Sequence, residues 1–330
     1  MIDETHKTLL DLYKQMFRIR RVEETISEKY SEQEMRCPMH LSIGQESVAV
    51  GVCHSLGTDD VVFSNHRAHA HYLAKGGSLN ELISELYGKQ SGCSGGRGGS
   101  MHLISKDVGF HGSTPIVGGT VPIAVGAAWS FKLQNNNNIS VVFLGDGCFE
   151  EGVIHESLNF AALYKLPVLF VLENNLYSVY TPLSERQPNR EITDIVSAHG
   201  INAVKADGMD ILSVKECADS SINKIKSGDG PQFIEFSVYR WMEHCGPNDD
   251  DNLGYRPKGE LSNWKKRCPI ENARKKLEKI SNKERNSIIF DEKYNEEILN
   301  KINEEIKEAF EFAKNSSFPD KSSLSDYIYA

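Results

Sequence analysis

The chain has 330 residues, of which 39% are hydrophobic and 25% are charged, proportions that are ordinary for a folded globular protein and unlike those of a disordered chain. That length exceeds the roughly 250–300 residues at which a single hydrophobic core stops growing, so we expect one large domain with an appendage. The 37 basic and 46 acidic side chains give a net charge of −9, which excludes a general attraction to nucleic acid or to an anionic membrane.

Targeting and redox features favour the cytoplasm. The sequence contains no run of the about 18–20 apolar residues that a membrane span requires, and residues 1–21 are charged, without the apolar stretch of a secretory signal. The seven cysteines are odd in number, scattered and without a CxxC pair, which favours free thiols over a disulfide framework or a zinc ribbon. We therefore expect a cytoplasmic protein that binds neither nucleic acid nor a membrane.

The N-terminal part of the chain combines helices with unusual loops. Residues 5–35 carry apolar side chains at helical spacing, which predicts a surface helix. Three loops rich in His, Arg and Gly follow at 40–46 (HLSIGQE), 64–71 (SNHRAHAH) and 91–102 (SGCSGGRGGSMH), and long ordered loops of this kind are usually functional. Residues 118–133 are apolar and rich in small side chains, which predicts a buried helix packed closely on its neighbour.

The middle of the chain is predicted to form an open, mostly parallel α/β sheet with helices on both faces. Two short apolar runs, 139–147 and 166–175, flank a helical segment at 150–165, and this order is typical of parallel strands joined by a right-handed crossover. The alternation continues with a strand at 201–205, a helix at 212–227 and a strand at 231–240.

The C-terminal part changes in character after Trp241. A polar loop at 246–268 is followed by a Lys- and Glu-rich helix at 270–316. We divide the chain into an N-terminal helical segment (1–35), an α/β domain (36–245), and a loop with a helical C-terminal extension packed on that domain (246–330).

Two polar residues follow the strands of the predicted β-α-β unit. Asp146 comes after the first strand and Asn175 after the second, and ligands of open parallel sheets bind beyond these carboxyl ends. Oxygen ligands at neighbouring strand ends suit Mg²⁺ on a phosphate, Gly147 permits close approach, and a helix starting near 148–150 would present amides to an anion. The alternative is an N-cap at Asp146 and a turn at 174–175.

Two other clusters have competing interpretations. His66, His69 and His71 could bind a transition metal, although the fixed positive charge of Arg67 between them disfavours it. Arg97 and the glycines around it resemble a nest for an anion, whereas an ordered active-site loop is the alternative.

The chain resembles the alpha subunit of the decarboxylating component of 2-oxo acid dehydrogenases (pyruvate, branched-chain or acetoin type). The resemblance is carried in order by HLSIGQE, HRAH, GCSGGRGGSMHL, IVGGTVPIAVGAA, GDG…ENN, ADGMD (206–210), GPQFIEFSVYR and the terminal LSDYI (324–328). It covers nearly the whole chain and implies a thiamine-diphosphate-binding fold. The implied reaction decarboxylates a 2-oxo acid and passes the acyl unit to a lipoyl acceptor, for which the resemblance implies a lipoyl-bearing acyltransferase as a candidate partner.

The resemblance also implies roles for single residues. Magnesium would be held by the side chains of Asp146 and Asn175 and the backbone carbonyl of Tyr177. Residues expected to hold thiamine diphosphate are His66, Arg67, Pro115, Val117, Gly145, Gly147, Cys148 and Asn175. His40 and His244 match the family's active-site histidines, which would exchange protons as carbonyl adducts form and collapse; a core histidine and a loop histidine are the alternatives.

The loop after residue 240 departs from the family pattern. Glu243 stands where the family has Gly, Cys245 stands where mitochondrial pyruvate dehydrogenase has a phosphorylatable Ser, and Asp249 to Asp251 would place negative charge at the mouth of the site. These differences keep open a second function, a thiamine-dependent carboligase or aldehyde transferase without a lipoyl partner. A non-catalytic paralogue and a metal-dependent hydrolase are further alternatives.

One catalytic group is missing from the sequence. Thiamine catalysis needs a carboxylate on the pyrimidine ring, and Glu46 in IGQE is the only tempting candidate. By resemblance, the activating Glu comes instead from a beta subunit in an α2β2 heterotetramer. We therefore expect this chain alone to bind little cofactor and to be inactive.

Overall fold

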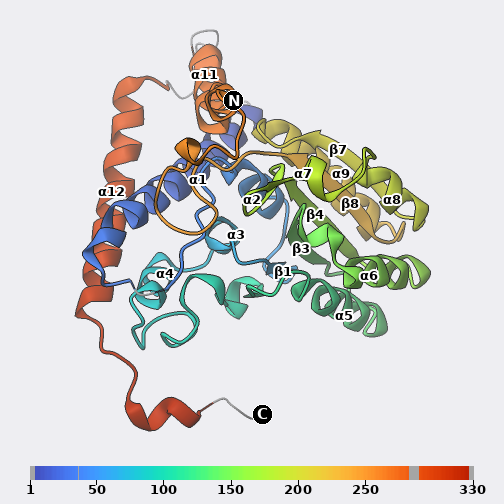
Figure 1. Cartoon of the computed structure of the whole chain (residues 1–330), viewed down its shortest axis with the longest axis horizontal. Coiled ribbons are helices and arrows are strands. Elements are labelled where there is room, and N and C mark those ends of the chain that lie inside the picture. The colour runs from blue at the N-terminus through green and yellow to red at the C-terminus, as the bar shows by residue number, and fades with distance from the viewer. Residues whose placement is uncertain (1–3, 36, 282–289, 327–330) are drawn as a thin grey trace.

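The computed structural model describes residues 4–35, 37–281 and 290–326. A single six-stranded sheet organises them, with strand order β2-β1-β3-β4-β8-β7 and parallel pairing throughout (Figure 1). The strands in sheet order are β2 (Phe110–Ser113), β1 (Val61–Ser64), β3 (Ser140–Gly145), β4 (Val168–Asn174), β8 (Gln232–Ser237) and β7 (Asn202–Asp207). The predicted open parallel α/β fold is confirmed.

The central strands alternate their side chains between two hydrophobic cores, as the two-residue period of a strand requires. In β3, Val141 and Phe143 face one core while Val142 and Leu144 face the other. Both faces are therefore covered, which explains why these strands are apolar throughout.

Helices from both ends of the chain cover the first face. These are α1 (Glu4–Lys29), α2 (Glu46–Cys53), α3 (His69–Ala74), α4 (Leu79–Leu86), α9 (Ile211–Lys226), α11 (Pro269–Ser281) and α12 (Glu292–Asn315). Figure 1 shows α12 running along the outside of α1 and α4. The second face carries α5 (Thr120–Leu133), α6 (Gly152–Leu163) and α8 (Ile192–Ala198).

Two helix predictions were wrong in exposure. The N-terminal helix ends at Lys29 and is enclosed rather than superficial, since α11 and α12 pack over it. The helix predicted as buried at 118–133 buries only one stripe against the sheet, and Ile123 and Leu133 are 57% and 71% exposed. The buried stripe is Thr120, Val121, Ala124, Val125 and Ala128. Because the opposite side of α5 is equally apolar, the sequence held no pattern to distinguish them.

Three element boundaries also differ from prediction. The loop predicted at 64–71 is shorter than expected, because α3 begins at His69 and only residues 65–68 separate it from the end of β1 at Ser64. The helix expected from residue 150 begins at Gly152, after a 3₁₀ turn at Cys148–Glu150. The single helix predicted at 270–316 is two helices, α11 and α12, and residues 282–289 between them lie outside the described part. Of the terminal LSDYI motif, residues 327 and 328 also lie outside it.

Short elements complete the chain at the carboxyl edge of the sheet. A two-stranded hairpin, β5 (Tyr177–Ser178) with β6 (Thr181–Pro182), leads into α7 (Leu183–Arg186). The short α10 (Glu260–Lys265) follows the polar loop after β8. None of the helices in the described ranges is long and apolar enough to cross a membrane.

Candidate active site at the carboxyl ends of the strands

The ends of β3 and β4 bring the two predicted metal ligands together. Strand register pairs Gly145 with Glu173, so Asp146 and Asn175 follow directly on adjacent strands and line one cavity. Asp146 is fully buried. Burial raises the pKa of its carboxyl, opposed chiefly by Arg186 and by hydrogen bonds from backbone amides including that of Asn175. A buried carboxylate is costly unless a positive charge lies beside it. A bound metal ion could supply that charge at Asp146.

Arg186 supplies the positive charge at Asp146 in this structure. Its guanidinium donates to the carboxylates of both Asp146 and Glu150, and its Nε donates to the carbonyl of Thr181 at 3.1 Å. The hairpin β5–β6 and α7 carry Arg186 back over the strand ends. Nothing in the sequence near Arg186 signalled this contact, because 40 residues separate the two partners.

Asn175 is held in place from two sides. Its Nδ2 donates to Oε1 of Gln45 at 3.1 Å, and its Oδ1 accepts from the backbone N–H of Tyr177 at 3.2 Å. The hydroxyl of Tyr177 donates to Glu260 at 2.6 Å, so that side chain is anchored elsewhere and the Tyr177 backbone is what remains at the cavity. Gln45, like Arg186, was missed by sequence reasoning.

The cavity gathers most of the predicted cofactor residues. Of these, the lining includes His66, Arg67, Val117, Gly145, Asp146, Gly147, Cys148, Asn175 and Tyr177. Pro115 is not among the lining residues, whereas its neighbour Ile116 is, and its predicted contact with the aminopyrimidine stays a prediction. The cavity volume of about 80 Å³ is small beside the ~300–1,000 Å³ typical of ligand sites.

Gly147 lies where the wall of the cavity is tightest. A Cβ built there would lie 2.7 Å from Oγ of Ser178 and 3.0 Å from its Cβ, closer than real side chains approach. A larger residue at this position would therefore force the Ser178 side chain to move. Gly147 and Cys148 both line the cavity, and backbone amides at the start of a helical turn suit an anion.

Arg67 and three histidines form the opposite wall. Arg67 is buried, and its guanidinium donates to the carbonyls of Leu41 at 2.6 Å and His244 at 3.2 Å. Burial lowers its pKa to about 10, so it stays charged at neutral pH. Burial, with Arg67 as the next cause, lowers the pKa of His40 to about 2, of His244 to about 3 and of His66 to about 4.

The depressed histidine pKa values predict a loss of stability in acid. Below the ordinary pKa of 6.5, the unfolded chain binds protons that the folded chain refuses, so the free energy of unfolding falls as pH drops from about 6.5 toward 4. Each such group costs about 1.4 kcal/mol per pH unit. His66→Phe should therefore lose about 2 kcal/mol less than the unchanged chain between pH 7 and pH 5, measured by urea unfolding. Equal losses in the two proteins would contradict this assignment.

The predicted alternative of a metal site at His66, His69 and His71 is wrong. His69 lies on α3 with Nδ1 3.3 Å from Glu23 and Nε2 2.8 Å from Oγ of Ser100. His71 lies 3.3 Å from Glu173 and stacks on Phe143. Because α3 turns both rings into the core, His66 is left to meet His40 and His244 instead.

Glu46 is committed to the core rather than to catalysis. It is fully buried and forms a bidentate ion pair with Arg20, at 2.5 and 3.0 Å, and Arg20 lies 4.0 Å from the ring of Trp241. The carboxylate also accepts from the backbone N–H of Gly44 at 3.1 Å. It therefore cannot serve as a free activating carboxylate.

Glu46→Gln is expected to destabilise the fold strongly. The amide would leave the buried Arg20 charge uncompensated, at a cost of about 3–5 kcal/mol. The free energy of unfolding in urea measures the loss. Glu305→Gln is the matched control, because Glu305 makes the same bidentate pair with Arg18 near the surface, where pairs contribute about 0–1 kcal/mol. Similar losses in both variants would contradict a structural role specific to Glu46.

The glycine-rich loop at 91–102 wraps around an anion from its own chain. Glu85, fully buried at the end of α4, accepts backbone N–H bonds from Ser94, Gly96, Gly98 and Gly99 at 2.6–3.0 Å. The predicted anion nest is thus real but filled internally. Arg97 points away and donates to the carbonyl of Ser323 at 2.6 Å.

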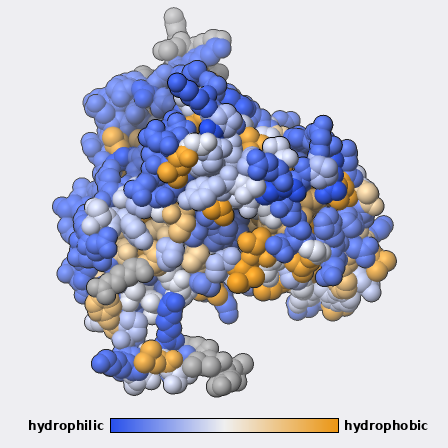
Figure 2. Space-filling view, viewed as in Figure 1, coloured by the Kyte–Doolittle hydropathy of each residue, from blue (hydrophilic) through white to orange (hydrophobic). Residues whose placement is uncertain are grey.

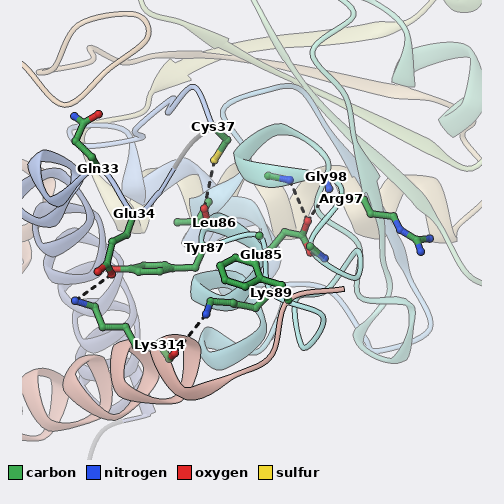
Figure 3. A pocket seen from close by; sticks show the side chains of 14 residues that line it. Gln33, Glu34, Cys37, Glu85, Leu86, Tyr87, Lys89, Arg97, Gly98 and Lys314 are labelled. Atoms are coloured by element: carbon green, nitrogen blue, oxygen red, sulfur yellow. Dashed lines mark hydrogen bonds and ion pairs between the residues drawn. The ribbon is translucent and has the colours of Figure 1, made fainter. Parts of the chain in front are cut away.

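A larger cavity of about 790 Å³ lies beside this loop (Figure 3). Its charged groups are engaged with one another: Lys314 lies 3.2 Å from Glu34, and Lys89 donates to the carbonyls of Lys314 and Ser316. It lacks the convergent oxygen donors of the strand-end cavity. We therefore assign the chemistry to the strand ends.

Only part of the acidic loop is available as the charged rim that was expected. Asp250 is buried, with its carboxylate 3.3 Å from both Arg240 and Arg256. It serves as the counter-ion of two buried arginines, while Asp249 and Asp251 remain exposed. Glu243 closes the same loop by accepting hydrogen bonds from the backbone and side chain of Asn248, at 2.9 and 2.8 Å. His244 lies within the turn that these bonds close.

The chain is similar to known proteins over nearly its whole length. A family model described as "dehydrogenase E1 component" matches residues 14–322. The chain is 35% identical over 326 residues to the alpha subunit of acetoin:2,6-dichlorophenolindophenol oxidoreductase of Bacillus subtilis (strain 168), covering 98% of this chain and 94% of that protein. It is 36% identical over 327 residues to the chloroplastic pyruvate dehydrogenase E1 component subunit alpha-3 of Arabidopsis thaliana (97% and 74%). It is 37% identical over 269 residues to the corresponding alpha subunit of Rhizobium meliloti (strain 1021) (81% and 76%).

Proposed function

The chain belongs to the dehydrogenase E1 component family, and from this premise we propose that it is the alpha subunit of a thiamine-diphosphate-dependent 2-oxo acid dehydrogenase of pyruvate or acetoin type. The observation that carries the proposal is the cavity at the ends of β3 and β4, where Asp146, Gly147 and Asn175 meet Arg67. The acyl unit would pass to a lipoyl acceptor.

The donor set of this cavity fits a diphosphate bridged by Mg²⁺. Oxygen donors are present in the carboxylate of Asp146, the amide of Asn175 and the backbone carbonyl of Tyr177, and magnesium prefers oxygen ligands while keeping several non-protein ones. The amides of Gly147 and Cys148 and the charge of Arg67 suit phosphate oxygens. Arg186 must give up its contact with Asp146 to admit the metal.

His66 and Val117 complete the proposed cofactor contacts. His66 lies beside Arg67 on the diphosphate side, and Val117 would hold the aminopyrimidine through its backbone. When bound, thiamine diphosphate supplies the carbanion that attacks the 2-oxo acid carbonyl.

His40 and His244 are proposed to act as general acid–base groups beside the cavity. Their rings lie 5.2 Å apart and are neutral at pH 7, since burial and Arg67 lower the pKa of each. A diphosphate beside Arg67 would offset that positive charge and raise both pKa values toward the ordinary histidine value. Acid–base groups placed in this way typically contribute about 10²–10⁴-fold to the rate.

A beta subunit is the proposed partner, in an α2β2 assembly. Large apolar side chains are exposed beside the cavity and along α5, namely Ile116, Val117, Ile123 and Leu133. Figure 2 shows apolar surface near the centre of the molecule, close to where Figure 1 labels β1. An exposed apolar patch next to an incomplete cavity supports an interface there. The seven free cysteines support a reducing compartment such as the cytoplasm.

Reconstitution tests the proposal. The chain is assembled with its beta subunit, thiamine diphosphate and Mg²⁺, and reduction of 2,6-dichlorophenolindophenol is followed with pyruvate, branched-chain 2-oxo acids and acetoin. Dye reduction with one of these substrates that requires both subunits is the expected result. An assembled, cofactor-loaded complex that turns over none of them would refute the dehydrogenase assignment.

A further inference from the structure

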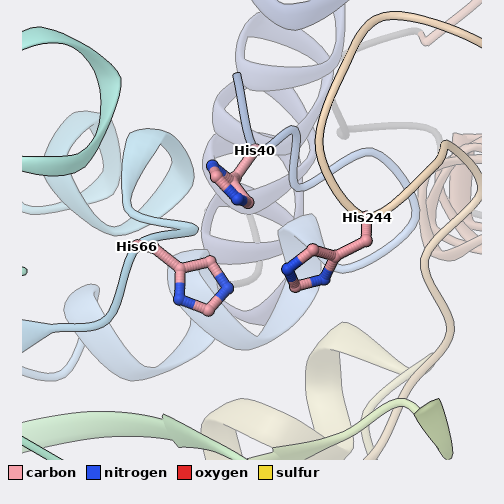
Figure 4. Close-up of side chains that lie close together, drawn as sticks. All are labelled: His40, His66 and His244. Atoms are coloured by element: carbon pink, nitrogen blue, oxygen red, sulfur yellow. The ribbon is translucent and has the colours of Figure 1, made fainter. Parts of the chain in front are cut away.

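Three histidines from distant parts of the chain meet at the mouth of the cavity (Figure 4). His40 precedes α2, His66 follows β1, and His244 follows β8. Their ring centroids are separated by 4.7 Å (His40–His66), 5.2 Å (His40–His244) and 5.3 Å (His66–His244). One ring nitrogen of each lies within 4.8 Å of the others, and within the described residues this is the group of three that could converge on one ion.

The rings are in the chemical state that a metal requires. Burial lowers the pKa of all three, so each imidazole is neutral at pH 7 and has a lone pair to offer. Nδ1 of His40 is buried and has no hydrogen-bond partner. This nitrogen is therefore available to bind an ion. His66 and His244 border the cavity, so an ion can reach them.

Arg67 is the group that opposes a cation here. Its Nη2 lies 3.5 Å from Nδ1 of His244. Arg67 is directed at the carbonyls of Leu41 and His244, and its own field contains two carboxylates, Glu23 and Glu173, besides the second guanidinium of Arg240. The charged groups that act on the three rings are Arg67 and, at His244, also Arg240. An ion therefore binds here against a positive field, which the convergence of three neutral imidazoles must outweigh.

We propose that His40, His66 and His244 form a transition-metal site that takes Zn²⁺ or Co²⁺, separate from the oxygen-donor site at Asp146. Zn–N bonds of about 2.0–2.1 Å place tetrahedral ligands roughly 3.4 Å apart, so the rings must close by small side-chain rotations. Three nitrogen ligands leave a fourth position for water. The donor types sort the ions, because imidazole suits zinc and cobalt whereas carboxylate and amide oxygens suit magnesium.

Occupancy of this site has a consequence for the proposed function. The ion would occupy the ring nitrogens of His40 and His244, which are proposed to transfer protons, and would lie beside the cavity. Zinc is therefore an inhibitor that acts on this chain, and saturating Mg²⁺ does not relieve it.

The test titrates Co²⁺ and Zn²⁺ into the full chain without thiamine diphosphate, following the visible spectrum of Co²⁺ and the heat of Zn²⁺ binding. One site with a tetrahedral cobalt spectrum is expected, unaffected by excess Mg²⁺. His66→Phe and, independently, His244→Phe should each weaken binding by about 100-fold or more, since even outer-shell partners contribute about 10–100-fold. Circular dichroism establishes that each variant is folded.

His155→Phe is the matched control. Nδ1 of His155 lies 3.4 Å from Nε2 of His199, so this pair is the competing site for a soft metal, and the substitution should leave the cobalt spectrum and affinity unchanged. The proposal is overturned if folded His66→Phe and His244→Phe bind as tightly as the unchanged chain, or if only His155→Phe removes binding. Because no cofactor or beta subunit is present, failure here is distinct from failure of the dehydrogenase assignment.

Discussion

Asp146→Ala is expected to abolish magnesium-dependent binding of thiamine diphosphate by the assembled complex, weakening it by at least about 100-fold. Asp146 is a buried carboxylate at the end of β3, and it is the charged oxygen donor adjacent to Asn175. The other carboxylate lining this cavity, Glu173, is already engaged by His71 at 3.3 Å. Calorimetry with the cofactor, with and without Mg²⁺, measures the effect.

Asp207→Ala is the control for that experiment. Asp207 also ends a parallel strand, β7, but at the far edge of the sheet, where it pairs with Arg267 at 2.8 Å and is half exposed. The fold should survive in both variants, because Arg186 keeps Glu150 as a partner when Asp146 is removed. Unchanged cofactor affinity in Asp146→Ala would refute the magnesium assignment.

The purified chain without its partner is expected to show no thiamine-dependent decarboxylation above that of the free cofactor, a loss of at least about 100-fold relative to the complex. Five acidic side chains around the cavity are committed: Asp146 and Glu150 to Arg186, Glu173 to His71, Glu23 to His69, and Glu46 to Arg20. None of these five is free to activate the pyrimidine ring, and we expect that carboxylate to come from the beta subunit.

Release of CO₂ from pyruvate by the chain alone, then after addition of the beta subunit, checks this expectation. The cavity of about 80 Å³ also predicts weak cofactor binding until the partner contributes walls. Decarboxylation by the chain alone at a rate near that of the complex would show that the site is complete within one subunit.

The sheet and the meeting of Asp146 with Asn175 could be predicted because they depend on local pattern. Continuous apolar runs predicted β3 and β4 as strands buried on both faces. Asp146 and Asn175 were expected to meet because parallel strands end at the same edge of the sheet. The strands β1 and β2 escaped prediction, since each has only four residues and lies among loops rich in Gly and His.

Contacts between distant residues could not be predicted. Arg186 reaches Asp146 through a hairpin, and the histidine trio joins positions 40, 66 and 244, which no spacing rule connects. The exposure of α5 was equally hidden, because a helix apolar on all sides does not reveal which side a partner covers. Asp250 shows the same limit. The sequence presents three consecutive acids as one charged patch, yet the middle one pairs with two buried arginines, Arg240 and Arg256, that lie outside this acidic segment.

Glu85 has a consequence for how the glycine-rich loop tolerates substitution. The loop at 91–102 has little regular structure of its own, and four of its amides converge on that one carboxylate. The shape of the loop therefore depends on a residue outside it. Replacing Glu85 would remove the acceptor of four backbone N–H groups at once, so a single substitution in α4 would disturb the whole turn.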